Sequence, residues 1–372
     1  MSSRFAGLQD FDHAAALRIG VLLVNLGTPD APDATAVRRY LAEFLWDPRV
    51  VELPRPLWWA ILHGVILRVR PARSARAYRR VWTHQGSPLM VNTLAQVRGL
   101  RDALHDEHRG QVRIAAAMRY GTPSIASAID ELAAQGVNRL LVLPMYPQYS
   151  GTTTGSVFDA VASVLARRRW VPHLAFVSGY HDDPGYIGAL TASIREFWQH
   201  DGIPTRLLFS FHGIPRRYFL AGDPYHCQCH HTARLVAQAL ELEPSRWKVS
   251  FQSRVGREEW LRPYTDETLE QWGRDGLQSV HVVCPGFAAD CLETIDEINV
   301  ENRERFAHAG GGRFAYIPAL NDRDDHVRAL AALVSRVCAP WTGWAQAEFS
   351  NAAQQPNPRH ERARAMAMAM QR

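Results

Sequence analysis

The feature that most constrains the fold is an alternation of short apolar, β-branched runs with longer amphipathic segments along most of the chain. This alternation is typical of β-α-β units, in which helices connect the strands of a mostly parallel sheet. We expect strands at residues 19–26, 112–118, 139–144 and 173–177, then at 205–210, 248–253, 279–284 and 313–317. We expect helices at 123–135, 156–169, 186–199, 233–242, 265–273, 290–308 and 324–337.

The eight expected strands divide into two groups of four, which predicts an α/β protein with two doubly wound domains. A cluster of Gly179, Pro184 and Gly185 marks the boundary. The N-terminal domain would span 18–178, with a helical insertion at about 36–105 between its first two strands, and the C-terminal domain would span 179–338. Residues 339–372 are biased toward Ala, Gln and Arg, and we expect a flexible or loosely docked tail there.

The charge pattern argues against nucleic acid as a partner, because the formal net charge is only +5. No acidic residue lies between Leu53 and Leu100, whereas eight arginines do. Such a segment is either a solvated helix face or a surface for an anionic lipid or substrate. The first 18 residues lack a secretory apolar core, and the longest apolar stretch, 56–67, is too short to span a bilayer. We therefore expect a cytoplasmic protein that at most rests on the inner face of the membrane.

Ligands of open α/β sheets bind beyond the carboxyl ends of the strands, so the turns after the strands are the first places to look for a site. Four of these turns are unusual in composition, and we expect them to face one cleft between the two domains. They comprise residues 25–29, 144–154, 210–215 and 284–290.

His212 follows a strand-like run and precedes Gly213 and Pro215, which would hold the turn rigid. A neutral imidazole in this place can accept a proton near pH 7 or bind a divalent transition metal. The alternative is a structural histidine, which is commoner for a lone His.

Four carboxylates follow the turn at 284–287 with the spacing of one helix face: Asp290, Glu293, Glu297 and Glu301. This stripe would point into the cleft opposite His212 and could pass a divalent cation or protons. Alternatively, Asp290 and Glu293 form a capping box and the others a solvated face.

Aromatic residues near these turns suit a flat aromatic ligand, although aromatic side chains are usually core. They are Tyr120, Tyr146, Tyr149, Trp260 and Phe287. Neither a phosphate-binding loop nor a dinucleotide fingerprint is present, so the reaction should need neither ATP nor NAD.

The five cysteines are an odd and scattered set, which favours reduced thiols over a disulfide framework. The sequence Cys227-x-Cys229-His230-His231 suggests a zinc or iron–sulfur site. Ligands this close together cannot all bind one ion, however, and Cys284 and Cys291 lack the usual paired spacing. We therefore expect no cluster.

Taken together, the motifs closely resemble those of the ferrochelatase family, in the same order and over about residues 18–338. The segments that carry the resemblance are 24–29 (VNLGTP), 44–48 (FLWDP), 86–88 (GSP), 118–121 (MRYG), 143–149 (LPMYPQY), 210–215 (SFHGIP), 222–225 (GDPY), 251–256 (FQSRVG) with Trp260, and 284–287 (CPGF) through 290–294 (DCLET).

The resemblance implies two Rossmann-like domains of the chelatase type, each a four-stranded parallel sheet flanked by helices, with a porphyrin between them. It implies insertion of Fe(II) into protoporphyrin IX, giving protohaem and two protons in the last step of haem biosynthesis. His212 would be the base, and His212 and Glu293 would face the metal. Asp290, Glu297 and Glu301 would continue the path. The porphyrin would contact Leu26, Ser87, Arg119, Tyr120, Ser253, Trp260 and Phe287.

The resemblance further implies that the segment around Trp58 and Trp59 is a lip that covers the pocket and rests on a membrane. A pocket shaped to a saddled ring would bind the distorted porphyrin better than the flat one, and this differential binding would be the catalysis. Two N–H protons must leave as Fe(II) enters, which requires a base close to the ring centre.

Some positions depart from the family's pattern. Leu26 stands where some members carry Tyr or Met, so no metal ligand is available there, and Cys291 stands where others place a His beside the carboxylate. The C-terminal cysteine group that binds a 2Fe–2S cluster in some members is missing, with Cys338 alone nearby. We therefore expect no required cofactor, with Fe²⁺ as a substrate.

Two alternatives remain open at this stage. A cobalt chelatase of the same fold would predict a second His near Glu293, which Cys291 argues against, and a haem or porphyrin carrier would use His212 as an axial ligand. The sequence does not decide between protoporphyrin and coproporphyrin, between a monomer and a homodimer, or between the His212 and Glu293 sides as the route of the metal.

Overall fold

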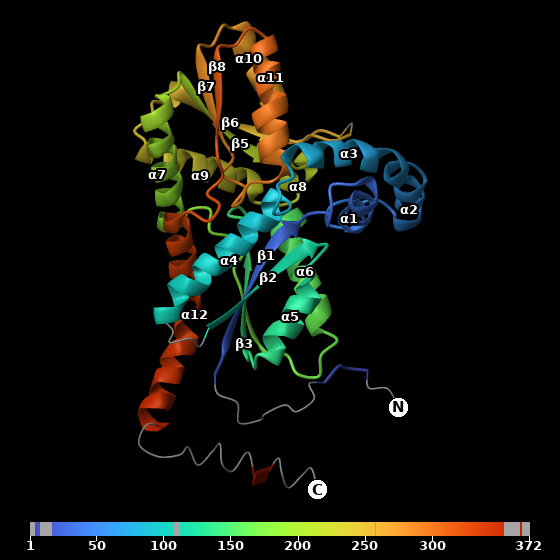
Figure 1. Cartoon of the computed structure of the whole chain (residues 1–372), viewed down its shortest axis with the longest axis vertical. Helices are drawn as coiled ribbons and strands as arrows, with labels where there is room; N and C mark the ends of the chain where they lie inside the picture. Colours follow the sequence, from blue (N-terminus) through green and yellow to red (C-terminus); the bar gives the residue numbers. More distant parts are fainter. Residues whose placement is uncertain (1–3, 8–16, 108–111, 257, 353–364, 367–372) are drawn as a thin grey trace.

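The computed structural model describes residues 4–7, 17–107, 112–256, 258–352 and 365–366. Two four-stranded parallel sheets lie one above the other along the longest axis of the molecule (Figure 1). The first contains β1 (Ile19–Gly27), β2 (Val112–Tyr120), β3 (Arg139–Pro144) and β4 (His173–Phe176) in the order β2-β1-β3-β4. The second contains β5 (Arg206–His212), β6 (Trp247–Gln252), β7 (Ser279–Val283) and β8 (Arg313–Ile317) in the equivalent order β6-β5-β7-β8. The predicted fold class is confirmed.

Three strands extend further than predicted, and each extension ends in polar or small residues. β1 and β2 remain paired as far as Gly27 and Tyr120, and β5 remains paired as far as His212, which lies opposite Gln252 of β6. The apolar pattern stops before these residues, although they are still paired with the neighbouring strand. His212 is therefore the last residue of its strand instead of lying two residues beyond it.

Helices cover both faces of both sheets, as parallel strands that are buried on both sides require. In the N-terminal domain, α5 (Ile125–Ala134) and α6 (Ser156–Leu165) pack on one face. α4 (Pro88–Glu107) covers the other face. In the C-terminal domain, α7 (Pro184–Asp201) and α9 (Tyr225–Ala239) pack on one face, and α10 (Thr265–Arg274) and α11 (Arg303–His308) on the other. One apolar core contains residues of both sheets, such as Leu23 and Phe209, and so joins the two domains.

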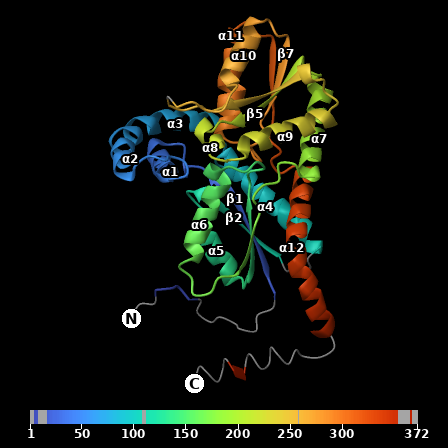
Figure 2. The same cartoon turned by 180° about the vertical axis from the view of Figure 1, so that it is seen from behind.

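The last helix, α12 (Asp324–Ala352), leaves the C-terminal domain and runs along the N-terminal one (Figures 1 and 2). It packs against α7 and α4 and reaches β3. Cys338 and Trp341 are buried, and the Trp341 ring lies edge-on to His173. The expected start of the tail at residue 339 is therefore too early, because an Ala-rich composition also favours helix. Residues 353–364 and 367–372 lie outside the described part of the chain.

The predicted insertion forms a small helical unit that projects to one side of the domain interface (Figure 2). It consists of α1 (Ala34–Trp46), α2 (Arg55–Ile61), the π-helix η1 (Leu62–Ile66) and α3 (Leu67–Val81), whereas α4, which the predicted bounds of 36–105 included, packs on the sheet. Val37, Leu41 and Leu62 form its own core, which packs against Tyr120 at the end of β2. We call α2, η1 and α3 the lip. No helix within the described residues is long and apolar enough to cross a membrane.

The helix expected at 290–308 begins later than predicted and is partly a π-helix, η4 (Glu293–Asn302), which leads into α11. Asp290 lies in the turn before it and does not form the capping box considered as an alternative. Its carboxylate instead accepts hydrogen bonds from Thr294 Oγ1 (2.8 Å), Tyr316 OH (2.7 Å) and Asn321 Nδ2 (2.8 Å). Hydrogen bonds to Tyr316 and Asn321, which are distant in sequence, thus replace that helix cap.

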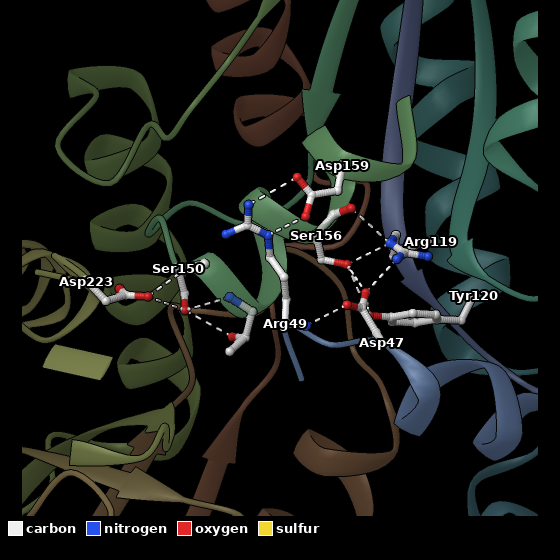
Figure 3. A network of polar contacts seen from close by, with 10 residues as sticks. Asp47, Arg49, Arg119, Tyr120, Ser150, Ser156, Asp159 and Asp223 are labelled. Atoms are coloured by element: carbon white, nitrogen blue, oxygen red, sulfur yellow. Dashed lines mark hydrogen bonds and ion pairs between the residues drawn. The ribbon is translucent and has the colours of Figure 1, made fainter. Parts of the chain in front are cut away.

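A buried carboxylate, Asp47, fixes the α1–α2 connection against the end of the first sheet (Figure 3). Asp47 Oδ2 accepts hydrogen bonds from Tyr120 OH (2.8 Å), Ser156 Oγ (2.5 Å) and the Arg119 guanidinium, and Oδ1 accepts from the Arg49 backbone N–H (2.8 Å). Burial alone would raise the pKa of Asp47, but the hydrogen bonds from Ser156, Arg49 and Tyr120 and the charge of Arg119 hold it below its ordinary value.

The same polar network reaches the C-terminal domain. Asp223, at the turn before α9, accepts hydrogen bonds from Ser150 Oγ (2.9 Å) and from the Gly151 backbone N–H (2.7 Å). Arg49 binds Asp159 of α6 through two guanidinium nitrogens (2.5 and 3.1 Å). The β3–α6 connection is therefore held by charged side chains of the insertion and of both domains.

Replacing Asp47 by Ala should lower the free energy of unfolding by about 3 kcal/mol, because it leaves the Arg119 charge and two buried hydroxyls without their acceptor. Urea unfolding at pH 7 measures this loss. Asp30→Ala is the control, because Asp30 makes an exposed ion pair with Arg39, and it should change stability by no more than about 0.5 kcal/mol. A loss below about 1 kcal/mol for Asp47→Ala would contradict the role of Asp47 as an anchor.

Candidate active site

The turns at the carboxyl ends of the two sheets meet, as predicted. Leu26 at the end of β1 and Leu89 of α4 pack against Phe287, Ala289 and Cys291, which lie between β7 and η4. Leu292, the residue before Glu293, packs into the apolar core that contains Tyr120 and the helices of the insertion. The turn after β1 therefore contacts the turn that precedes η4.

His212 lies half-buried at the end of β5 with a defined tautomer. Its Nδ1 is 2.6 Å from the Gly213 carbonyl oxygen. Because a carbonyl can only accept, Nδ1 carries the hydrogen, and Nε2 of the neutral ring keeps a free lone pair. Gly213 has to be glycine for steric reasons: a Cβ there would lie 2.9 Å from the Gln252 carbonyl oxygen and 3.0 Å from the Trp260 ring.

The surroundings of His212 favour its neutral form. Burial lowers the pKa of His212, while the negative charge of Glu293 and the hydrogen bond to Gly213 oppose this effect only in part. The imidazole is therefore mainly unprotonated at neutral pH. The charge of Glu293 thus acts on the His212 ring, and the expectation that the two side chains face one another stays a prediction.

Glu293, at the start of η4, acts electrostatically on three buried side chains that can ionise. Burial is the main cause that raises the pKa values of Tyr40, Tyr78 and Cys291, and the charge of Glu293 adds to it in each case. Sequence reasoning missed Tyr40 and Tyr78, because nothing in the α1 and α3 segments links them to a residue more than two hundred positions away.

Glu297 lies one turn further along η4 and is bound by Ser253. Its carboxylate accepts hydrogen bonds from the Ser253 backbone N–H (2.7 Å) and Oγ (2.5 Å). Ser253 adopts a left-handed backbone conformation with φ 66°, which orients both donors toward Glu297. Burial raises the pKa of Glu297 to about 7 and outweighs the hydrogen bonds from Ser253, which lower it; the charges of Glu293 and Glu301 add smaller upward effects.

Glu301 continues the series at the outer end of η4, but it pairs with a residue of the lip. Arg80 of α3 binds both carboxylate oxygens of Asp296 (2.7 and 2.6 Å) and lies 3.7 Å from Glu301. This bidentate contact ties the lip to η4. Asp290 does not join the series, because Tyr316 and Asn321 hold its carboxylate.

The remaining predicted residues lie around the same region. The polar ends of Arg119 and Tyr120 bind Asp47, and the ring of Tyr120 is buried. Ser87 is buried at the start of α4, where its Oγ accepts a hydrogen bond from Met90 N (3.2 Å). The Trp260 ring centroid lies 6.3 Å from that of His212. Leu26 and Phe287 are partly buried against Leu89 and Cys291.

The fold is that of a chelatase. The solved structure of SirB from Bacillus subtilis with Fe³⁺ superposes with a TM-score of 0.53 at 13% identity, covering 88% of this chain and 98% of that one. The family model described as Ferrochelatase matches residues 18–337. Ferrochelatases of Thioalkalivibrio sulfidiphilus and Nitrosococcus oceani are 55% and 53% identical to the chain, and the alignments cover 98% of it and 99% and 98% of those proteins. The chain belongs to the ferrochelatase family and is an enzyme of the lyase class.

The raised pKa of Glu297 predicts a pH-dependent stability. Between the unfolded carboxyl pKa, about 4.5, and the folded value, about 7, the folded protein binds a proton that the unfolded chain does not. Glu297 therefore stabilises the fold at pH 4.5 and below, and this contribution is lost as the pH rises through about 7. Urea unfolding at pH 5 and pH 8 should show that Glu297→Gln gains stability relative to the unchanged protein as the pH rises.

The matched comparison is Glu301→Gln, which should show a clearly smaller gain, because Glu301 is about half exposed and its charge is the smallest cause of the raised pKa of Glu297. An equal effect of Glu297→Gln at both pH values would mean that Glu297 ionises as an ordinary carboxyl.

Proposed function

We propose that the protein inserts Fe(II) into protoporphyrin IX and releases protohaem and two protons, in the last step of haem biosynthesis. The observation that carries the proposal is the neutral His212 ring, with Nε2 free to accept a proton, within reach of the Glu293 charge where the two sheets meet. Family membership supplies the reaction class.

The proposed mechanism assigns the proton transfers to groups of this chain. His212 Nε2 removes pyrrole protons from the bound ring, and the depressed pKa of His212 keeps it unprotonated between turnovers. Glu293 faces the metal and stabilises the imidazolium that forms. Glu297, whose pKa is about 7, passes protons onward because both of its protonation states are populated near neutral pH. Glu301 lies at the outer end of this route. Asp290 contributes to the route only indirectly, because its carboxylate stabilises the turn before η4.

We further propose that the macrocycle lies between the domains in contact with the seven residues implied by the family resemblance. A ring that is saddled on binding exposes its nitrogen lone pairs to the incoming ion, so that a site shaped to this state lowers the barrier. The reaction needs no resident cofactor, because iron and porphyrin are both substrates and side chains transfer the protons. We therefore also expect that the protein carries no 2Fe–2S cluster.

His212→Ala should reduce the rate of anaerobic Fe(II) insertion into protoporphyrin by about 10²–10⁴-fold while porphyrin binding persists, because a general base contributes about this factor. The matched control is His230→Ala, whose ring contacts His226 and Phe251 outside the site, and it should leave the rate within about twofold. Retention of the rate in His212→Ala would contradict the base assignment. Faster turnover of coproporphyrin by the unchanged enzyme would contradict the proposed substrate.

The lip suits a peripheral contact with an anionic membrane surface on the cytoplasmic side. Its exposed apolar side chains include Leu57, Trp59, Val65 and Val69, which are 54–70% exposed. Exposed arginines flank them on the same helices: Arg68, Arg70, Arg73, Arg76 and Arg79. Apolar insertion together with basic charge is the combination that binds anionic interfaces reversibly. Such a contact would deliver the apolar porphyrin beside the site.

Cosedimentation with vesicles tests this contact. Binding should be strong to phosphatidylglycerol vesicles, weak to phosphatidylcholine vesicles and reduced by salt. The double substitution Trp59→Glu and Val69→Glu should lower it by about tenfold or more, because it removes apolar insertion and adds repulsion. Ile203→Glu is the control, because Ile203 is 67% exposed and lies between α7 and β5, at the opposite end of β5 from His212. Equal binding of both variants would contradict the lip as the contact surface.

A further inference from the structure

A second group of potential metal ligands lies at the junction of the two domains, on elements that the active site does not use. His181 and Asp182 belong to the segment before α7, and His231 belongs to α9. One ligand atom from each of these residues lies within 4.8 Å of the others. His231 Nδ1 is 3.3 Å from His181 Nε2, and the Asp182 carboxylate is 3.8 Å from the His181 ring.

We propose that His181, Asp182 and His231 bind a divalent transition metal, with Zn²⁺ as the best match. Two imidazoles and one carboxylate are ligands that Zn²⁺ accepts. Two nitrogens bound to tetrahedral Zn²⁺ at about 2.05 Å each are about 3.3 Å apart, which equals the separation of the two ring nitrogens here. A water molecule or a fourth side chain would complete the tetrahedron.

Cys227 is the side chain to test as a fourth ligand, because its sequence spacing places it on the same helix face as His231. Cys227 lies four residues before His231 on α9, so the two residues are neighbours on one face of the helix, and Cys227 is exposed. The motif that suggested a metal in the sequence therefore contributes His231 to the proposed site. Cys229 is buried in the apolar core and His230 packs against His226 and Phe251, so these two residues take no part.

The protein holds these ligands in place before any metal binds. Thr232, next to His231, donates a hydrogen bond to the His181 carbonyl oxygen (2.7 Å) and accepts one from Gln148 of the N-terminal domain (3.0 Å). Asp183, which follows Asp182, accepts hydrogen bonds from the first turn of α7 and pairs with Arg336 of α12. A metal ion would therefore link the segment before α7 to α9 within the C-terminal domain.

Equilibrium dialysis of the full-length protein against Zn²⁺, with bound metal counted by elemental analysis, tests the proposal. His231→Ala should bind one zinc fewer than the unchanged protein, and His230→Ala is the matched control with unchanged stoichiometry. Zinc held by the chelation site would count equally in all three proteins. Equal stoichiometry and affinity in His231→Ala and the unchanged protein would overturn the proposal.

Asp182→Asn keeps the test valid if His231→Ala fails to fold, because the Asp182 side chain is 54% exposed. It should weaken zinc binding by about tenfold or more, and unchanged affinity would count against the site. Zn²⁺ should raise the midpoint of thermal unfolding in the unchanged protein and in His230→Ala, because a ligand of the native state stabilises it. With Co²⁺ as the probe, a thiolate charge-transfer band that Cys227→Ser abolishes would assign the fourth ligand to Cys227, and its absence would assign it to water.

Discussion

The site depends on the hydrogen bond from His212 Nδ1 to the Gly213 carbonyl oxygen. This bond fixes the tautomer, and burial at the end of a central strand keeps the ring neutral. Gly213 allows the turn to approach Gln252 and Trp260 closely enough to hold that geometry. The free lone pair on Nε2 that the proposed chemistry needs therefore depends on the position of His212 at the end of β5 and on the turn at Gly213.

The electrostatics around this ring come from both domains. The C-terminal domain supplies His212 and the carboxylates of η4, whereas Tyr40 and Tyr78 come from the insertion of the N-terminal domain. Arg80 joins the insertion to η4 through Asp296, and Asp47 joins it to the first sheet. The positions of Glu293 and Glu297 thus depend on contacts that hold the two domains together. π-Helices are frequent at functional sites, and η4 presents both of these carboxylates.

The strands were predictable because they rest on local patterns, whereas the expectation that His212 and Glu293 face one another stays a prediction. Fully buried parallel strands have continuous apolar sequences, and strand ends are where such folds place their sites. The ends of β2 and β5 were missed because Arg119 and His212 are polar yet still belong to their strands. The start of η4 was missed because Tyr316 and Asn321, 26 and 31 residues beyond Asp290, hold its carboxylate. The positions of Tyr40 and Tyr78 depend on tertiary packing that no local pattern records.

The most direct test of the central claim is an NMR titration of the His212 ring in the unchanged enzyme and in Glu293→Gln. We predict the Nδ1–H tautomer, a pKa below the ordinary value of 6.5, and a further decrease when the Glu293 charge is removed. A pKa at or above 6.5, the opposite tautomer, or no response to Glu293→Gln would contradict the account of His212 as a neutral base facing that carboxylate.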